Sequence, residues 1–483
     1  MDRHGLKLVE VCKTYHHASA EIVKCKTSIA YTWFRIGTQV KCLREACKHL
    51  DPEFLQILDD LLVVLVSELT LLTAKVQRLS KDSRGSRLKY VFLKKSLESV
   101  ISSLDVCQQK FYPHWYMEVV KFIPENISIV RPDLGSESRE PTPLETARLI
   151  QVVLSPENPS GLNDMFCTPI DAEHARVTDI EGSTAKVLRH ATNKNKAYII
   201  DSLRCSQIMN AAELESDVTI FARKLRAINP VRFSMLQCKG IQRTRAEGNE
   251  LQYDLIFRFP SKSTAEPTSL ASLIASARQH SLSERLKIAQ QLARAVSYVH
   301  ILDFVHKNIR PESVLAFGQT DESLGSLYLV GFEMFRREGG ETRLRGDSSW
   351  VKNIYRHPER QGETPKRKHL MQHDIYSLGV CLLEIGLWTP ILPLIAEAER
   401  NRSIVEDVPH TFDSRNPLPL HLVKRYLERL ANTGLPSVMG DQYRDVVVTC
   451  LTCLDAENLD FADDIVSEGI TYVEKVGQLR LGA

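Results

Sequence analysis

The sequence has no long apolar run, no cysteine framework and no low-complexity tract. Its most apolar stretch, residues 61–72, contains Glu68 and is shorter than the roughly 20 apolar residues that a membrane-spanning helix needs. The 11 cysteines follow no disulfide spacing, and no signal-peptide pattern precedes them. We therefore expect reduced thiols in a cytoplasmic protein, peripheral to a membrane at most, and exclude a secreted scaffold held by disulfides.

The composition is that of a folded chain with more than one core. Hydrophobic residues make up 43% and charged residues 25% of a chain of 483 residues, which is too long for one ordinary core. The net charge is +2, but residues 1–122 hold 19 Lys and Arg against 13 Asp and Glu. The basic run between Lys75 and Lys95 could contact an anionic surface such as a membrane leaflet or nucleic acid, although a solvated helix end and loop is the simpler interpretation. We expect no nucleic-acid partner.

The first 123 residues have the pattern of a helical bundle. Asp51 and Pro52 are a typical helix start, and the residues that follow place eight apolar side chains on one stripe. The stripe consists of Phe54, Leu58, Leu61, Leu65, Leu69, Leu72, Val76 and Leu79. A stripe on a rod about 40 Å long requires partner helices. We predict an all-α bundle over residues 1–123 with an interaction role, since it pairs no nucleophile with a base, and a linker over residues 124–165, where Pro and Gly recur.

The remainder changes from a β-rich to a helical pattern. Short β-like runs occur at residues 185–188, 196–203 and 251–259, with a helical stretch at 211–228. A long helix follows, and Ser281 and Glu284 form a capping box at its start. This order predicts an α+β bilobal fold, with a smaller lobe over residues 166–265 and a larger one over 266–480.

Four motifs in this part resemble those of protein kinases. The run HKNIRPES at residues 306–313 is similar to the catalytic loop, and GFE at 331–333 stands where that family carries D-F-G. Pro358 and Glu359 are in register with the A-P-E segment, and Asp374 occupies the position that supports the catalytic loop from beneath. The resemblance covers residues 170–478 and implies a kinase-like fold after the bundle.

The chemistry of phosphoryl transfer is not matched at these motifs. Asn308 stands where the family has a general base, a group worth about 10²- to 10⁴-fold in rate, and Gly331 offers no carboxylate to Mg²⁺. Ser313 supplies only a weak neutral oxygen. We class the catalytic-loop positions His306, Asn308, Arg310 and Ser313, and the metal-motif positions Gly331, Phe332 and Glu333, as degenerate. Pro358, Glu359 and Asp374 keep structural roles.

The nucleotide-binding elements also depart from the family. Only Gly182 precedes the second β-like run, so a glycine-rich phosphate cover is missing, and Asp201 stands at or beside the expected lysine. We therefore predict that the chain is not an enzyme but a pseudokinase, with no catalytic residue, no metal and no ATP or Mg²⁺ as cofactor. The alternatives are a metal held by Glu333, or phosphates reached by Lys194 or Lys196.

The combination of a bundle with a kinase-shaped domain resembles mixed lineage kinase domain-like proteins and fungal pseudokinase-like proteins with a HeLo-like N-terminal domain. The run WFRIGTQVKCLRE is similar to the second group. This resemblance implies signalling in cell death or allorecognition, in which the kinase-shaped domain docks other proteins. The bundle, residues 1–123, would bind an anionic membrane or self-associate. A cytosolic scaffold without a membrane role, and an atypical active kinase that binds ATP, are the alternatives.

Overall fold

A computed structural model describes most of the chain from residue 165 to residue 458 and few residues before it. The described residues are 165–167, 175–190, 197–204, 211–245, 251–260, 266–276, 278–318, 320, 323–332, 335–337, 349–366, 368–400, 420–455 and 458, together with Val63, Ser67, Thr70 and Val153. The chain divides into two compact units, Met1–Ser155 and Pro156–Ala483.

The first unit contributes four described residues. Val63, Ser67 and Thr70 are helical and exposed, and none of them belongs to the predicted apolar stripe. Val153 is helical and buried. The rest of the predicted bundle and nearly all of the predicted linker lie outside the described residues, so both stay predictions.

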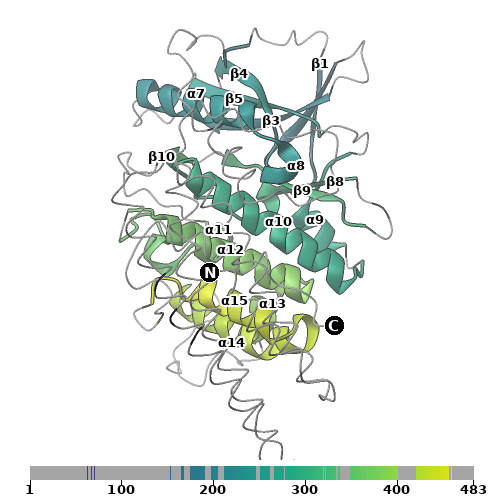
Figure 1. Cartoon of the computed structure of the whole chain (residues 1–483), viewed down its shortest axis with the longest axis vertical. Helices are drawn as coiled ribbons and strands as arrows, with labels where there is room; N and C mark the ends of the chain where they lie inside the picture. The colour runs from purple at the N-terminus through teal and green to yellow at the C-terminus, as the bar shows by residue number, and fades with distance from the viewer. Residues whose placement is uncertain are drawn as a thin grey trace, which may run out of the picture. The chain divides into compact units, whose positions relative to one another are not determined.

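A five-stranded antiparallel sheet forms the smaller lobe of the second unit (Figure 1). Its strands are β1 (Ala175–Asp179), β2 (Lys186–His190), β3 (Ala197–Arg204), β4 (Cys238–Arg245) and β5 (Leu251–Arg258), in the order β1-β2-β3-β5-β4. Helix α7 (Ala211–Ala227) packs on β4 and β5, and the short α8 (Pro230–Phe233) follows it. The predicted strands near 185–188, 196–203 and 251–259 thus correspond to β2, β3 and β5, whereas β1 and β4 were not predicted.

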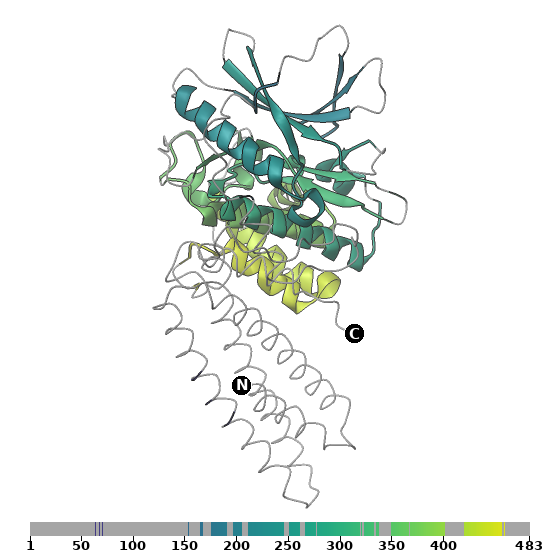
Figure 2. The same cartoon turned by 45° about the horizontal axis from the view of Figure 1, so that its top comes forward.

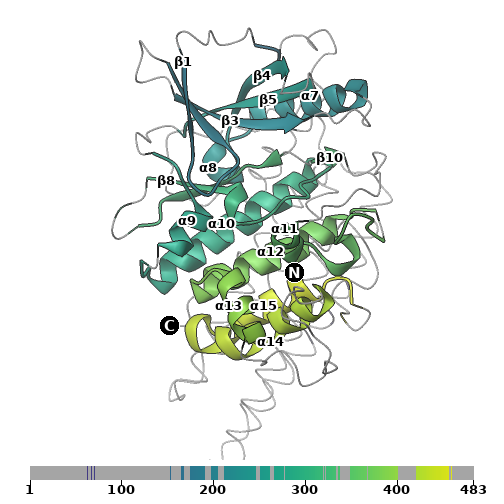
Figure 3. The same cartoon turned by 180° about the vertical axis from the view of Figure 1, so that it is seen from behind.

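The larger lobe is mainly helical, and its helices are stacked away from the sheet (Figures 2 and 3). Its helices are α9 (Leu270–Ala275), α10 (Leu282–Ile301), η5 (Pro311–Ser313), α11 (Trp350–Ile354), η7 (Pro358–Arg360), α12 (Met371–Leu387), α13 (Ile391–Arg400), α14 (Leu420–Met439) and α15 (Asp441–Leu451). Two small sheets complete the lobe, β6 (Thr268–Ser269) with β8 (Val314–Phe317) and β9 (Ser326–Leu329), and β7 (Phe304–Val305) with β10 (Arg336–Arg337). This sheet-plus-helix architecture is consistent with a kinase-like fold.

The start of α10 differs in part from the predicted capping box. Ser281 is the N-cap, and its hydroxyl accepts a hydrogen bond from the Glu284 backbone N–H at 3.2 Å, as predicted. The Glu284 carboxylate accepts instead from Ser323 Oγ and from the Leu324 backbone N–H. It therefore fixes the loop before β9, a partner that sequence spacing could not reveal.

Helix α12 is the centre of the larger lobe. Every residue from Met371 to Gly386 is buried, and α10, α14 and α15 pack around it. Among the described residues no single helix is long and apolar enough to span a membrane. The bent pair formed by α12 and Ile391–Ala398 meets that test on length and composition only, and α12 does so as a buried core helix.

Candidate functional site

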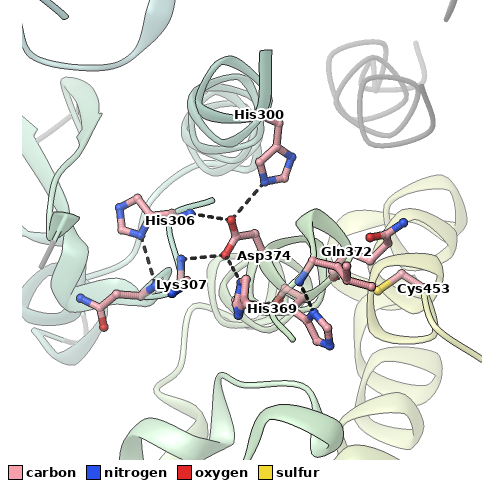
Figure 4. A network of polar contacts seen from close by, with 11 residues as sticks. His300, His306, Lys307, His369, Gln372, Asp374 and Cys453 are labelled. Carbon is pink, nitrogen blue, oxygen red and sulfur yellow. Dashed lines mark hydrogen bonds and ion pairs between the residues drawn. The ribbon is translucent and has the colours of Figure 1, made fainter. Parts of the chain in front are cut away.

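The candidate site begins with the support of the catalytic-loop segment by Asp374 (Figure 4). Asp374 lies in the first turn of α12 and is fully buried. Its carboxylate accepts the backbone N–H groups of His306 at 2.7 Å and Lys307 at 2.9 Å. Lys307 has φ +64°, a left-handed conformation that costs a non-glycine residue free energy. The two bonds to Asp374 therefore hold a strained turn in place.

Two imidazoles complete the shell around Asp374. His300 Nε2, at the end of α10, lies 3.1 Å from one carboxylate oxygen, and His369 Nε2 lies 3.0 Å from the other. Burial by itself would raise the pKa of Asp374, but His369 and hydrogen bonds from both imidazoles hold that pKa well below its usual range. Asp374 is thus a buried anion with four donors, and sequence analysis had not identified His300 or His369 as two of them.

Three buried histidines in contact with or close to Asp374 remain neutral at neutral pH. Burial lowers the pKa of His306 to about 4, although the Asp374 charge and a hydrogen bond to the Val330 carbonyl oppose the shift. Burial likewise lowers the pKa of His369 to about 4 and that of His373 to about 2. Between these values and neutral pH, folding therefore favours the uncharged imidazoles.

A column of rings crosses from the smaller lobe to the catalytic-loop segment. The ring of Phe332 lies between Phe221 of α7, with centroids 4.8 Å apart, and His306, with centroids 4.7 Å apart. Phe335 and Phe304 pack against Phe221 from the same region. The Phe332 side chain thus packs between the two lobes and contributes to the stability of their contact.

Asn308 and Gly331, the two positions where carboxylates were missing in the sequence, are in contact. Asn308 is buried, and its Nδ2 donates to the Gly331 carbonyl at 3.1 Å. Gly331 has φ +80°, and a Cβ there would lie 2.7 Å from Ser313 Cβ and 3.3 Å from Asn308 Nδ2. A side chain at residue 331 would therefore meet both steric contact and backbone strain.

Substitution at Gly331 gives a test with a matched control. Gly331→Ala should destabilise the domain by more than Gly318→Ala, because Gly318 has a similar φ of +75° but no atom within 4 Å of the added Cβ. The strain common to both is about 1–2 kcal/mol. The additional destabilisation of Gly331→Ala over Gly318→Ala, measured as the difference between their urea midpoints, reports the steric contact with Ser313. Equal midpoints would contradict this contact.

The hydroxyl of Ser313 is used locally. Its Oγ donates to the Arg310 carbonyl at 2.8 Å and accepts from the Arg310 backbone N–H at 3.1 Å. The Ser313 carbonyl accepts from the Val330 backbone N–H. The segment 308–313 is thus bonded within itself and to the backbone of residues 330 and 331. Glu333, Lys194 and Lys196, the alternatives for metal and phosphate binding, lie outside the described residues.

Asp201, which was predicted to stand at or beside the position of the lysine in protein kinases, binds the same backbone. It lies on β3 and is almost fully buried. One of its carboxylate oxygens accepts the backbone N–H groups of Gly331 at 2.8 Å and Phe332 at 2.7 Å. A charge-assisted pair of this kind is stronger than two neutral hydrogen bonds.

Pro358 and Glu359 lie in η7, which His357 caps. The side chains of His357, Glu359 and His373 come close enough together to suggest a metal site. However, Nδ1 of His357 accepts the Glu359 N–H, and Nδ1 of His373 accepts the Leu370 N–H at 2.7 Å. Each neutral ring then carries its proton on Nε2, whereas a histidine ligand usually donates from the nitrogen that does not bind the metal. The proton on Nε2 would therefore have to move before either ring could bind a metal ion through that atom.

Glu384, which sequence analysis did not identify, is a second buried carboxyl group on α12. Its oxygens accept the Tyr355 hydroxyl and the Ile391 backbone N–H. Burial, with a smaller contribution from Glu312, raises its pKa from 4.5 to about 8 against the effect of these bonds. This carboxyl group is therefore mostly protonated at neutral pH.

The raised pKa of Glu384 predicts a loss of stability with rising pH. Between pH 4.5 and 8 the folded chain holds a proton that the unfolded chain releases, so stability falls by up to about 1.4 kcal/mol per pH unit. Glu384→Gln should remove this slope. Urea denaturation at pH 6 and pH 8.5 measures it, and an unchanged slope in the variant would contradict the assignment.

Comparisons with known proteins show a similarity to a protein kinase over part of the chain. No family model matches the sequence. Over 125 residues, 26% of this chain, the sequence is 32% identical to a probable cell division protein kinase of Encephalitozoon cuniculi (strain GB-M1). The chain spans only 37% of that relative's length. A chain from the structure of the CAK complex of Chaetomium thermophilum bound to ATP-γ-S matches with a TM-score of 0.38 and 16% identity, over 66% of this chain and 94% of that one.

The sequence similarity corrects one prediction. The chain was predicted not to be an enzyme, on the basis of side chains at Asn308, Gly331 and their neighbours. The similar protein is named as a protein kinase, so the relationship is to a kinase-like family of enzymes, and the prediction is wrong. Side chains at a few motif positions cannot define a family, because relatedness is distributed over many more residues. The kinase-like fold is supported, and the HeLo-like bundle stays a prediction.

Proposed function

We propose that the second unit is a kinase-like signalling domain that works by docking other proteins. The observation that carries this proposal is the packing at residue 331. The position where kinases hold Mg²⁺ is a glycine with φ +80°, whose added Cβ would lie 2.7 Å from Ser313 Cβ. The space at residue 331 is too small for a metal-binding carboxylate, which phosphoryl transfer needs and the docking of other proteins does not.

The environment of Asn308 supports the same proposal. Its amide nitrogen donates to the Gly331 carbonyl, so the side chain serves the backbone. An amide has no basic group that could accept a hydroxyl proton at neutral pH. We therefore propose that Asn308 and residue 331 do not hold Mg²⁺ and ATP.

A thermal-shift titration tests this proposal. A ligand that binds only the folded state raises the unfolding temperature. At a ligand concentration of about a hundred times Kd it increases the free energy of unfolding by about 2.7 kcal/mol. We expect ATP with Mg²⁺, at millimolar concentrations, to leave the transition of the full chain unchanged. A Mg²⁺-dependent rise would overturn the proposal.

Phosphotransfer is the second candidate, and the name of the relative with 32% identity favours it. If this chain transfers phosphate, its metal must be held by groups other than residue 331, and Glu333 is the nearest acidic residue in the sequence. Incubation with radiolabelled ATP measures the activity. Transfer that is lost in Glu333→Ala would establish this candidate in place of the first.

For residues 1–123 we propose binding to an anionic membrane or self-association, coupled to the kinase-like domain in a cytoplasmic signalling protein. The support is the basic run between Lys75 and Lys95 and the predicted apolar stripe. Sedimentation of the full chain with vesicles containing phosphatidylserine tests it at low and high salt. No binding at low salt would leave the cytosolic scaffold as the better interpretation.

A further inference from the structure

The smaller and larger lobes are joined by Asp201 at a buried point between them. This carboxylate comes from β3 of the smaller lobe, and the two N–H groups that it accepts belong to residues 331 and 332 of the larger lobe. The opposite side of the same backbone is held by the Asn308 amide through the Gly331 carbonyl. Residues 331 and 332 are thus fixed from both lobes.

A second junction lies at the turn between β1 and β2. The Ser183 hydroxyl donates to the Glu312 carbonyl in η5 at 2.7 Å. The hydroxyls of Ser269 and Ser272 donate to the Glu181 carbonyl at 2.7 and 3.0 Å. Gly182 has φ +66°, and a Cβ there would lie within 3 Å of both of these hydroxyls, so the turn requires glycine.

The two junctions close the domain at separate places. One fixes the turn over η5 and α9, and the other fixes β3 over the 331–332 backbone. Both are made by side chains of the chain itself, and both involve segments that the sequence analysis compared with the nucleotide-binding elements of protein kinases and found to depart from them. Neither junction requires a ligand.

We propose that Asp201 is an interlobe latch, which keeps the kinase-like domain closed without nucleotide and must be released before the lobes separate. A partner that prefers the open arrangement has to supply the free energy of breaking these bonds, so the latch sets the resting state of the docking domain. The regulatory role of the latch rests on the proposed docking function. The latch itself can be measured without partner or nucleotide, so an experiment can contradict the latch or the docking function independently of the other.

The chain offers a matched control for Asp201. Asp254, on the neighbouring strand β5, is also a buried carboxylate, and it accepts from Ser202, Thr244 and Gln252 within the same sheet. Its bonds therefore stay inside the smaller lobe. Asp254→Ala removes a buried carboxylate of the sheet without removing an interlobe contact.

Hydrogen exchange of the full chain tests the latch. In Asp201→Ala the amides of Gly331 and Phe332 should exchange about tenfold to hundredfold faster, because two buried N–H groups lose their acceptor. In Asp254→Ala the same amides should stay within about twofold of the unmodified chain. Asp201→Asn keeps one acceptor oxygen and should give an intermediate increase, and it decides the question if the alanine variant does not fold.

A distance measurement tests lobe separation independently. Spin labels at Val177 on β1 and Val438 on α14, both exposed, report on the two lobes. They should be introduced through unnatural amino acids, because the chain has 11 cysteines of its own. We expect a longer and broader distance distribution in Asp201→Ala than in Asp254→Ala. Identical distributions, together with unchanged exchange at residues 331 and 332, would overturn the latch.

Discussion

Replacement of Asp374 by asparagine is expected to destabilise the kinase-like domain by about 3–6 kcal/mol, because two hydrogen bonds to a charged group are lost at roughly 1.5–3 kcal/mol each. Each oxygen of Asp374 receives two donors, one backbone N–H and one imidazole. An amide nitrogen in either place would face two donors and could accept from neither. The measurement is the urea midpoint of the domain at pH 7.

Asp303→Asn is the matched control for this change. Asp303 is exposed, two residues after the end of α10, and has φ +68°, a conformation that asparagine tolerates as well as aspartate. We expect its midpoint to remain within about 0.5 kcal/mol of the unmodified chain. A loss below 1 kcal/mol in Asp374→Asn would show that the turn at His306 and Lys307 does not depend on this carboxylate.

Acid is expected to unfold the domain between pH 6.5 and 4. The pKa values of His306 and His369 fall to about 4, and that of His373 to about 2, so the unfolded chain takes up protons that the folded chain does not. The contribution of these histidines to stability is complete above pH 6.5 and falls below it by about 1.4 kcal/mol per pH unit for each histidine. Denaturation midpoints at pH 7, 6 and 5 measure the slope.

One variant isolates a single proton of this slope. In His373→Asn the side-chain oxygen can still accept the Leu370 N–H that caps α12, but it cannot be protonated in this range. The slope should then fall by about 1.4 kcal/mol per pH unit. Glu384 has the opposite pH dependence in an overlapping window, so Glu384→Gln is the better background for both measurements. An unchanged slope would mean that His373 is already charged in the folded chain.

Local patterns predicted the elements whose periodicity is strong. The apolar spacing after Ser281 identified α10, and HDIYSLGVCLLEI identified α12 nearly to its ends. Strand β1 was missed because ARVTD has one large apolar side chain, Val177, which is exposed. Strand β4 was missed because CKGIQRTR carries three basic residues, and only its first half is well buried. Both are held by pairing with neighbours, which a local pattern does not record.

The sequence indicated where the residues of the candidate site lie along the chain, but it did not indicate which of them form hydrogen bonds with one another. Motif spacing located His306, Gly331 and Asp374, yet it could not show that Asp201 reaches the backbone of residues 331 and 332, which are 130 and 131 positions away. The spacing of His369 and His373, four residues apart before and within α12, was a signal that could have indicated the histidine cluster. His300 gave no comparable signal, because it ends a helix 74 residues before Asp374.

The burial of Met371 to Gly386 in α12 also limits where the chain can be shortened. Gly379 lies against α15 so closely that a Cβ would be 2.8 Å from Cys450 Cβ and 3.2 Å from the Leu451 nitrogen. A truncation upstream of residue 450 would expose this face of an apolar helix to water and give an insoluble product. Expression of the kinase-like domain should therefore extend at least through Cys453, which is buried and donates from its thiol to the Gln372 carbonyl.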